Sequence, residues 1–140
     1  MNTPIEETLV LVKPDGVARN LTGEILRRIE AKGYSLVDVK LVEPDRALLA
    51  AHYAEHEGKP FYEPLVEFME SGPIVAFRVA GNRVIEGFRA LAGTTDPTTA
   101  APGTIRGDLG RDWGSKVQQN LVHGSDSPES AARELALWFD

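Results

Sequence analysis

The chain of 140 residues contains no cysteine. This absence excludes disulfide bonds, catalysis by a thiol and zinc sites built on thiolates. The sequence also lacks the two common glycine-rich phosphate loops, Gly-x-x-x-x-Gly-Lys-Ser/Thr and Gly-x-Gly-x-x-Gly. Any phosphate that this chain binds must therefore be held mainly by side chains.

Long apolar runs and an excess of positive charge are absent too. No stretch approaches the roughly 20 apolar residues that a membrane-spanning helix needs. Residues 1–7 carry Glu6 and Glu7 where a secretion signal has basic residues. The net charge is -6, and an acidic chain is a poor general binder of nucleic-acid backbones. We therefore expect a soluble, cytoplasmic protein that needs neither membrane nor nucleic acid.

The length and the spacing of apolar residues predict one domain, residues 1–140, of the α+β class. Hydrophobic residues make up 42% of the chain and charged residues 26%, as in ordinary globular domains. Alternation and short β-branched runs predict strands at 8–12, 37–41, 74–79 and 121–122. Helical spacing predicts helices at about 25–32, 47–56, 61–69, 84–92 after a cap at Asn82, and from Ser127 onward. This order suggests a sandwich with helices on one face of a mainly antiparallel four-stranded sheet.

The segment Asn120-Leu121-Val122-His123-Gly124-Ser125-Asp126-Ser127 places an imidazole at the end of a strand, just before a capped helix. Histidine titrates near neutral pH and acts as a nucleophile once a partner fixes its tautomer. Glu134, on the predicted last helix, could fold back toward the ring. A lone histidine at a strand end is more often structural, so the surrounding residues have to decide between the two readings.

For several basic and aromatic residues, a functional role and a structural role are both open. Arg89 and Arg106 can donate forked hydrogen bonds to phosphate, or they can be solvated surface charges. Lys13 lies at the end of the first predicted strand, before Pro14-Asp15-Gly16. It can be a phosphate ligand or a solvated charge at a turn. Tyr53 and Phe61 are core aromatics by default. Residues 94–104 contain no large apolar side chain, and such a loop is usually functional or mobile.

The segment around His123 resembles the active-site signature of nucleoside diphosphate kinases. The resemblance extends over nearly the whole chain as separate motifs in the right order. These motifs are Val12-Lys13-Pro14-Asp15-Gly16, His52-Tyr53, Lys59-Pro60-Phe61, Ser71-Gly72-Pro73, Arg89, Gly93, Thr95, Pro102-Gly103-Thr104-Ile105-Arg106-Gly107-Asp108, Glu129-Ser130-Ala131 and Trp138-Phe139.

The resemblance implies a ferredoxin-like fold and a phosphotransferase that moves the terminal phosphoryl group of a nucleoside triphosphate to a nucleoside diphosphate. His123 would carry the phosphoryl group, with Glu134 and Ser125 orienting its ring. The other implied ligands are Lys13, Tyr53, Arg89, Thr95 and Arg106 at the phosphates, Asn120 at the ribose and Phe61 stacked on the base. Magnesium held by the phosphates, without a protein ligand, and a homo-oligomer are also implied.

Two readings from other classes remain. His52-Tyr53-Ala54-Glu55-His56 matches the H-x-x-E-H pattern of a zinc metalloprotease helix, although no third ligand can be nominated. The simpler interpretation of this match is two surface histidines on an exposed helix. The second reading is a ferredoxin-like binding module that has lost catalysis, which one activity assay would separate from an enzyme.

The sequence departs from the family pattern in two places. The link 109–119, which contains Trp113, is a few residues longer than usual and puts the geometry ahead of Asn120 in doubt. We expect it to be a surface elaboration. The chain ends directly after Trp138-Phe139-Asp140, as in bacterial members of the family. That short end leaves the choice between tetramer and hexamer open.

Overall fold

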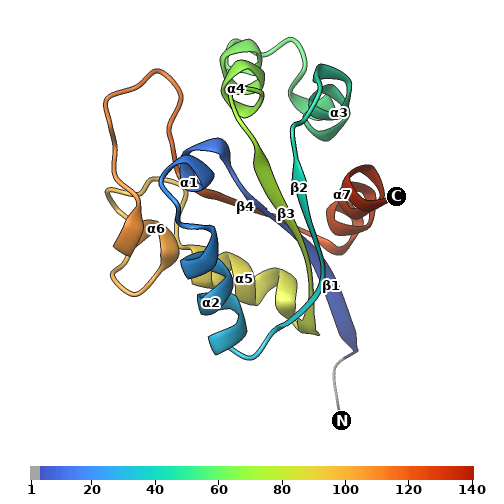
Figure 1. Cartoon of the computed structure of the whole chain (residues 1–140). Helices are drawn as coiled ribbons and strands as arrows, with labels where there is room; N and C mark the ends of the chain where they lie inside the picture. The colour runs from blue at the N-terminus through green and yellow to red at the C-terminus, as the bar shows by residue number, and fades with distance from the viewer. Residues whose placement is uncertain (1–3) are drawn as a thin grey trace.

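The computed structural model describes residues 4–140, so the first three residues of the acidic N-terminal segment lie outside it (Figure 1). In this range the strands are β1 (Ile5–Val12), β2 (Ser35–Val42), β3 (Ile74–Asn82) and β4 (Val122–Gly124). They form one sheet in the order β2-β3-β1-β4, and every neighbouring pair is antiparallel. The predicted antiparallel, ferredoxin-like sheet is confirmed.

Helices cover both faces of the sheet, so the prediction of helices on one face was wrong. One face packs on α2 (Thr22–Ala31), α5 (Val84–Ala92) and α6 (Ile105–Leu109). The other packs on α3 (Arg46–His52), α4 (Tyr62–Met69) and α7 (Pro128–Phe139).

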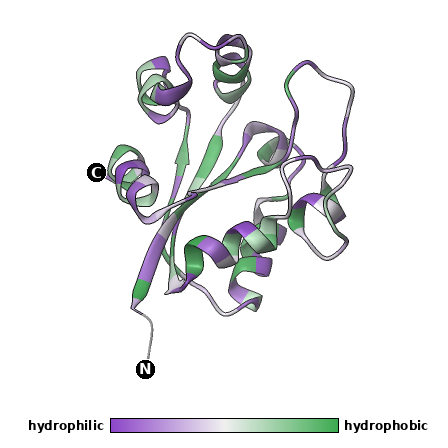
Figure 2. Cartoon of the chain, turned by 180° about the vertical axis from the view of Figure 1, so that it is seen from behind, coloured by the Kyte–Doolittle hydropathy of each residue, from purple (hydrophilic) through white to green (hydrophobic). Residues whose placement is uncertain are grey.

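The central strand explains the two covered faces. Val10 and Val12 of β1 point into the first core, and Leu9 and Leu11 point into the second. A strand buried on both sides reads as a continuous apolar run, and hydrophobic colour accordingly dominates the centre of the sheet in Figure 2.

Several local predictions differ from the structure. Pro14-Asp15-Gly16 does not merely break β1 but begins α1 (Pro14–Ala18). The helix predicted at 47–56 ends at His52, and a 3₁₀ turn, η1 (Ala54–His56), follows Tyr53. The cap of α5 is Arg83, with a left-handed φ of 54°, because Asn82 is still the last residue of β3.

Caps explain where the helices near the site begin. Thr104 starts α6, which the sequence analysis had not predicted, and its hydroxyl accepts the Gly107 N–H at 2.9 Å. Ser127 starts α7 as predicted, accepting the Ser130 N–H at 3.1 Å. These caps set where Arg106 and Glu134 lie along their helices.

Apart from Leu109, which ends α6, the link 109–119 lies in the long loop between α6 and β4 in Figure 1. Trp113 in this loop is 49% exposed, with the Arg111 guanidinium 4.3 Å and that of Arg19 5.7 Å from its ring centroid. The link lies on the surface, as expected. Within residues 4–140, no helix is long and apolar enough to cross a membrane.

Candidate active site

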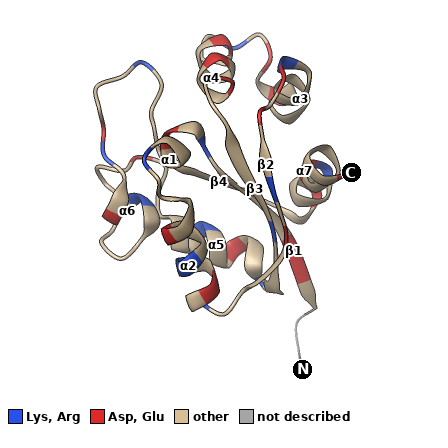
Figure 3. Ribbon diagram, in the orientation of Figure 1, with Lys and Arg blue, Asp and Glu red and all other residues tan. Residues whose placement is uncertain are grey.

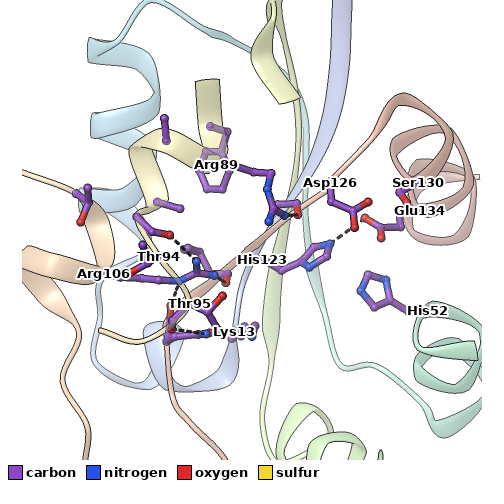
Figure 4. Close-up of a pocket in the computed structure, with 18 of the residues that line it drawn as sticks. Lys13, His52, Arg89, Thr94, Thr95, Arg106, His123, Asp126, Ser130 and Glu134 are labelled. Atoms are coloured by element: carbon purple, nitrogen blue, oxygen red, sulfur yellow. Dashed lines mark hydrogen bonds and ion pairs between the residues drawn. The ribbon is translucent and has the colours of Figure 1, made fainter. Parts of the chain in front are cut away.

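A cavity of about 720 Å³ opens beside β4, where side chains from α3, α5, α6 and α7 converge (Figure 4). Most of the predicted site residues line it: Lys13, Tyr53, Arg89, Thr95, Arg106, Asn120, His123 and Glu134. Two predicted residues do not. Ser125 is fully buried beneath the lining, and Phe61 lies outside it with 49% of its surface exposed.

His123 lies within β4, and its ring is fixed from one side. Its Nε2 atom is 2.8 Å from Oε1 of Glu134, and the Ser125 hydroxyl donates to the same oxygen at 2.8 Å. The backbone N–H of Leu9 in turn donates to the Ser125 hydroxyl at 3.3 Å. An ionised carboxylate only accepts hydrogen bonds, so Nε2 of a neutral His123 carries the proton and Nδ1 keeps its lone pair. Ser125 therefore acts on the ring through Glu134.

Glu134 is held ionised in a buried setting. Burial alone would raise its pKa, but hydrogen bonds from His123 and Ser125 hold that pKa below its ordinary value. Arg133 adds a cation 3.7 Å from Glu134 Oε2, and it also donates to the Ala51 carbonyl at 3.0 Å. Arg133 thus ties the end of α3 to α7 next to the carboxylate. No motif in the sequence pointed to Arg133.

His52 backs the His123 ring and is not a surface residue. Only 3% of it is exposed, and its ring centroid lies 4.7 Å from that of His123, edge to face. Trp138 Nε1–H donates to His52 Nδ1 at 3.0 Å. Since Nδ1 accepts, the proton of neutral His52 resides on Nε2. The interpretation of two surface histidines was wrong for His52, because α7 covers the end of α3.

The zinc reading of residues 52–56 does not fit this geometry. His52 ends α3 and His56 lies in η1, so the two residues are not on successive turns of one helix. One possible ligand atom from each of His52, His123 and Glu134 lies within 4.8 Å of the others. However, Nδ1 of His52 accepts from Trp138 and its Nε2 carries a proton, so neither nitrogen is a free ligand.

Lys13 and Asn120 form one wall of the cavity. Lys13 Nζ donates to Asn120 Oδ1 at 2.9 Å, and Asn120 Nδ2 donates to the Thr95 carbonyl at 3.1 Å. Burial, and secondarily the charge of Arg106, lowers the pKa of Lys13 to about 8. A nearby anion would favour the charged form of this amine.

Arg106 is held by the backbone around it. It donates to the carbonyls of Asn120 at 3.0 Å, Gly93 at 2.9 Å and Val122 at 2.7 Å. Burial, and then the neighbouring charge of Arg89, lowers the pKa of Arg106 to about 10. A guanidinium has five N–H donors, so two remain for a ligand.

The cations therefore form a local cluster, Lys13, Arg89 and Arg106, in a chain of net charge -6. Arg89 lies on α5 and Arg106 on α6, and in Figure 3 each of these two helices carries a blue stretch of ribbon. Neighbouring cations that repel one another are stabilised by an anionic ligand. The cavity is thus suited to a phosphate group beside His123.

The two predicted aromatics occupy different environments. Tyr53 is buried next to His52, with ring centroids 4.6 Å apart, and burial raises its pKa. Phe61 is exposed, and its ring meets that of His56 at 5.2 Å. His56 lines the cavity, so Phe61 lies at its outer rim.

The buried His52 predicts a pH dependence of stability. Burial, and then the neighbouring His123, lowers the His52 pKa to about 3, whereas the unfolded value is near 6.5. Below about pH 6.5 the unfolded chain therefore binds a proton that the folded chain excludes. The free energy of unfolding should then decrease by up to about 1.4 kcal/mol for each unit by which the pH is lowered. We expect urea unfolding between pH 7 and 4.5 to show this slope and His52→Gln to flatten it.

The matched control for that measurement is His56→Gln, because His56 is less buried and lies in η1. This variant should leave the slope unchanged. An undiminished slope in His52→Gln would show that other groups take up the proton. The depressed pKa of Glu134 adds a loss of the same sign at lower pH.

Comparisons with known proteins agree with this geometry. The family model of nucleoside diphosphate kinase matches residues 6–140. A nucleoside diphosphate kinase of Mycolicibacterium vanbaalenii is 62% identical over 135 residues, covering 96% of each chain. The chain belongs to the nucleoside diphosphate kinase family.

Solved structures of the nucleoside diphosphate kinase family share the fold. The enzyme of Halobacterium salinarum, in complex with CDP, superimposes with a TM-score of 0.91 at 47% identity, covering 98% of this chain and 89% of that one. The enzyme of Borrelia burgdorferi, a transition-state mimic with vanadate and ADP, gives 0.90 at 34% identity, covering 97% and 88%. Among residues 4–140, Trp138, Arg133 and Asp15 are site neighbours to which the sequence pattern had assigned no role, and His52 had been considered only as a zinc ligand or a surface residue. The motifs His52-Tyr53, Lys13-Pro14-Asp15 and Trp138-Phe139 were the available signals for three of these four residues.

Proposed function

We propose that this chain transfers the terminal phosphoryl group of a nucleoside triphosphate to a nucleoside diphosphate, in two steps through His123. The observation that carries the proposal is the ring of His123. Its Nε2 is engaged by Glu134 at 2.8 Å, and the ring lines the same cavity as the cations Lys13, Arg89 and Arg106. The protonated Nε2 leaves Nδ1 as the nucleophilic nitrogen.

In the first step, the lone pair of Nδ1 forms a bond to the terminal phosphorus. The bond from that phosphorus to the bridging oxygen breaks, and the nucleoside diphosphate leaves with the bonding electrons. Glu134 stabilises the positive charge that develops on the ring by accepting the Nε2 proton in a hydrogen bond. In the second step, a phosphate oxygen of another diphosphate attacks the same phosphorus, and Nδ1 leaves.

The other site residues would bind the nucleotide. Phosphoryl transfer depends mainly on positioning and on stabilisation of phosphate charge. We assign phosphate contacts to the cavity-lining donors, a ribose contact to Asn120 and base stacking at the rim to Phe61. The phosphate ligands are Lys13, Tyr53, Arg89, Thr95 and Arg106.

A divalent cation, magnesium in our proposal, would accompany the nucleotide. Magnesium prefers oxygen ligands and usually keeps phosphate and water in its shell. Of the carboxylates that line the cavity, Glu134 is engaged by His123 and Ser125, which leaves Glu55 and Asp126 at the edges. These residues fit a metal held chiefly by the phosphates, where it would neutralise charge on the transferred group.

We further propose a homo-oligomer. β2 is an edge strand, and it exposes 51% of Val37, 52% of Val39 and 69% of Leu41. An exposed apolar edge strand is a surface that favours pairing with another chain. Whether the assembly is a tetramer or a hexamer stays a prediction, as does the cytoplasmic location.

Labelling with ATP that carries a radioactive terminal phosphate tests the proposed function. We expect the protein to acquire label without any acceptor, because the first step stores the phosphoryl group on nitrogen. The label should be lost in acid, survive in base and leave when a nucleoside diphosphate is added. Steady-state kinetics should be ping-pong. An acid-stable label, or transfer that requires both nucleotides at once, would contradict the proposal.

A further inference from the structure

The backbone ahead of His123 contains a strained turn. Leu121 has φ of +72°, in the left-handed region that leucine rarely adopts. The N–H of Val122 donates to the carbonyl of Asn120 at 2.8 Å, which closes a three-residue turn around Leu121. Leu121 is only 1% exposed, so the conformation occurs inside the core. We refer to residues 120–122 as the 120–122 turn.

Such a conformation persists only where neighbouring groups hold it. The Lys13 N–H donates to the Leu121 carbonyl at 2.8 Å. On the other side of the same residue, the Leu121 N–H donates to Oδ2 of Asp15 at 3.1 Å. The Arg106 guanidinium donates hydrogen bonds to the two flanking carbonyls, those of Asn120 and Val122. Among the hydrogen bonds of residues 4–140, Asp15 provides the only side-chain bond to the backbone of Leu121 itself.

Asp15 is built into this position. It is 8% exposed, and its second oxygen, Oδ1, is buried without a hydrogen-bond partner among residues 4–140. Its charge opposes the lowering of the Lys13 pKa that burial and Arg106 produce. The backbone of α1 also approaches the turn closely, since a Cβ at Gly16 would lie 3.2 Å from the Leu121 carbonyl oxygen. Burying a carboxylate that accepts a single hydrogen bond costs free energy. This cost indicates that the contact of Asp15 with the Leu121 amide has a purpose.

The 120–122 turn determines which side chains of this segment line the cavity. Asn120 and His123 both line it, although only two residues separate them, while Leu121 between them packs into the core. We propose that Asp15 is a positioning residue, which holds Leu121 in the left-handed turn so that Asn120 and His123 face the same phosphate site. This role rests on the proposed function, because it acts through the residues assigned to nucleotide and phosphoryl group.

The test compares Asp15→Ala in three backgrounds: the natural chain, Leu121→Gly and Leu121→Ala. Both Leu121 variants lose the buried side chain, but only glycine adopts positive φ without strain. The readout is the single-turnover rate of labelling by ATP, per folded molecule. We expect Asp15→Ala to slow labelling roughly tenfold to a hundredfold in the natural chain, because small misplacements of reacting groups have effects of this size.

The same loss should appear with Leu121→Ala and shrink to less than about threefold with Leu121→Gly, where left-handed φ needs no support. Equal losses in the glycine and alanine backgrounds would overturn the proposal. Asp45→Ala is the matched control, since Asp45 also accepts a backbone N–H, from Leu48 at 2.8 Å, but caps the distant start of α3. It should lower stability and keep the labelling rate.

A second measurement decides the case if the Leu121 variants do not fold. The three-bond coupling between the α proton of residue 121 and the carbonyl carbon of residue 120 reports the sign of φ at residue 121, because it is large at positive φ and small at negative φ. We expect this coupling to change in Asp15→Ala and to stay near the natural value in Asp15→Asn, whose amide oxygen can still accept the Leu121 N–H. An unchanged coupling in Asp15→Ala would overturn the proposed role. An unlabelled natural chain would instead overturn the proposed function, and the coupling would still test the turn.

Discussion

His123→Ala should abolish labelling by ATP and reduce phosphoryl transfer to background. His123 keeps one ring nitrogen unprotonated in the cavity that Lys13, Arg89 and Arg106 line. His52 accepts a hydrogen bond at Nδ1 and carries its proton on Nε2, so it cannot replace the nucleophile. Without a nucleophile on the protein, two nucleotides would have to occupy one cavity together. The measurement is the radioactivity retained by the protein after ATP is removed.

Glu134→Gln should reduce the labelling rate less than His123→Ala does, and the two variants are compared in the same assay. The amide can still bond Nε2, but it does not stabilise the positive charge that develops on the ring. We expect labelling to slow by about tenfold or more and not to vanish, since a charge-assisted hydrogen bond contributes about 1.5–3 kcal/mol. Full labelling of His123→Ala would falsify the assignment of the nucleophile.

The sequence was sufficient for the architecture because the strongest patterns belong to long elements. The apolar run at 8–12 and the helical spacing after Ser127 correspond to β1 and α7. It was insufficient where elements are short. Residues 105–109 form one helical turn or so, which is too little for a periodic pattern, and their helix depends on the Thr104 cap.

The site was predictable where a residue acts through its own side chain. The contact of Glu134 with His123 followed from a helix that returns toward its preceding strand, and the structure places the two groups 2.8 Å apart. The partners of Arg106 were not predictable, because they are backbone carbonyls from three separate positions. The burial of His52 also depends on tertiary packing, since Trp138 reaches it across 86 residues.

Removing Arg106 should therefore affect both the fold and the reaction. Arg106→Ala leaves the carbonyls of Gly93 and Val122 without this donor, whereas the carbonyl of Asn120 still accepts the Val122 N–H. An unsatisfied buried group costs about 1–3 kcal/mol. The substitution also removes two N–H donors that can reach phosphate. We expect labelling to slow by about a hundredfold or more, the effect of losing a preorganised donor at a reacting group. Thermal unfolding should show the accompanying loss of stability.

Arg106→Lys separates charge from geometry. The ammonium keeps the positive charge but lacks the planar fork, so it cannot reach carbonyls in three directions and a phosphate as well. We expect a loss of labelling rate of at least about tenfold and a clear decrease in stability. Arg27→Ala is the control, because Arg27 pairs only with Glu24 on the surface of α2 among the contacts of the described residues. Wild-type labelling in Arg106→Lys would show that charge alone is required, and that the three backbone contacts do not set the rate.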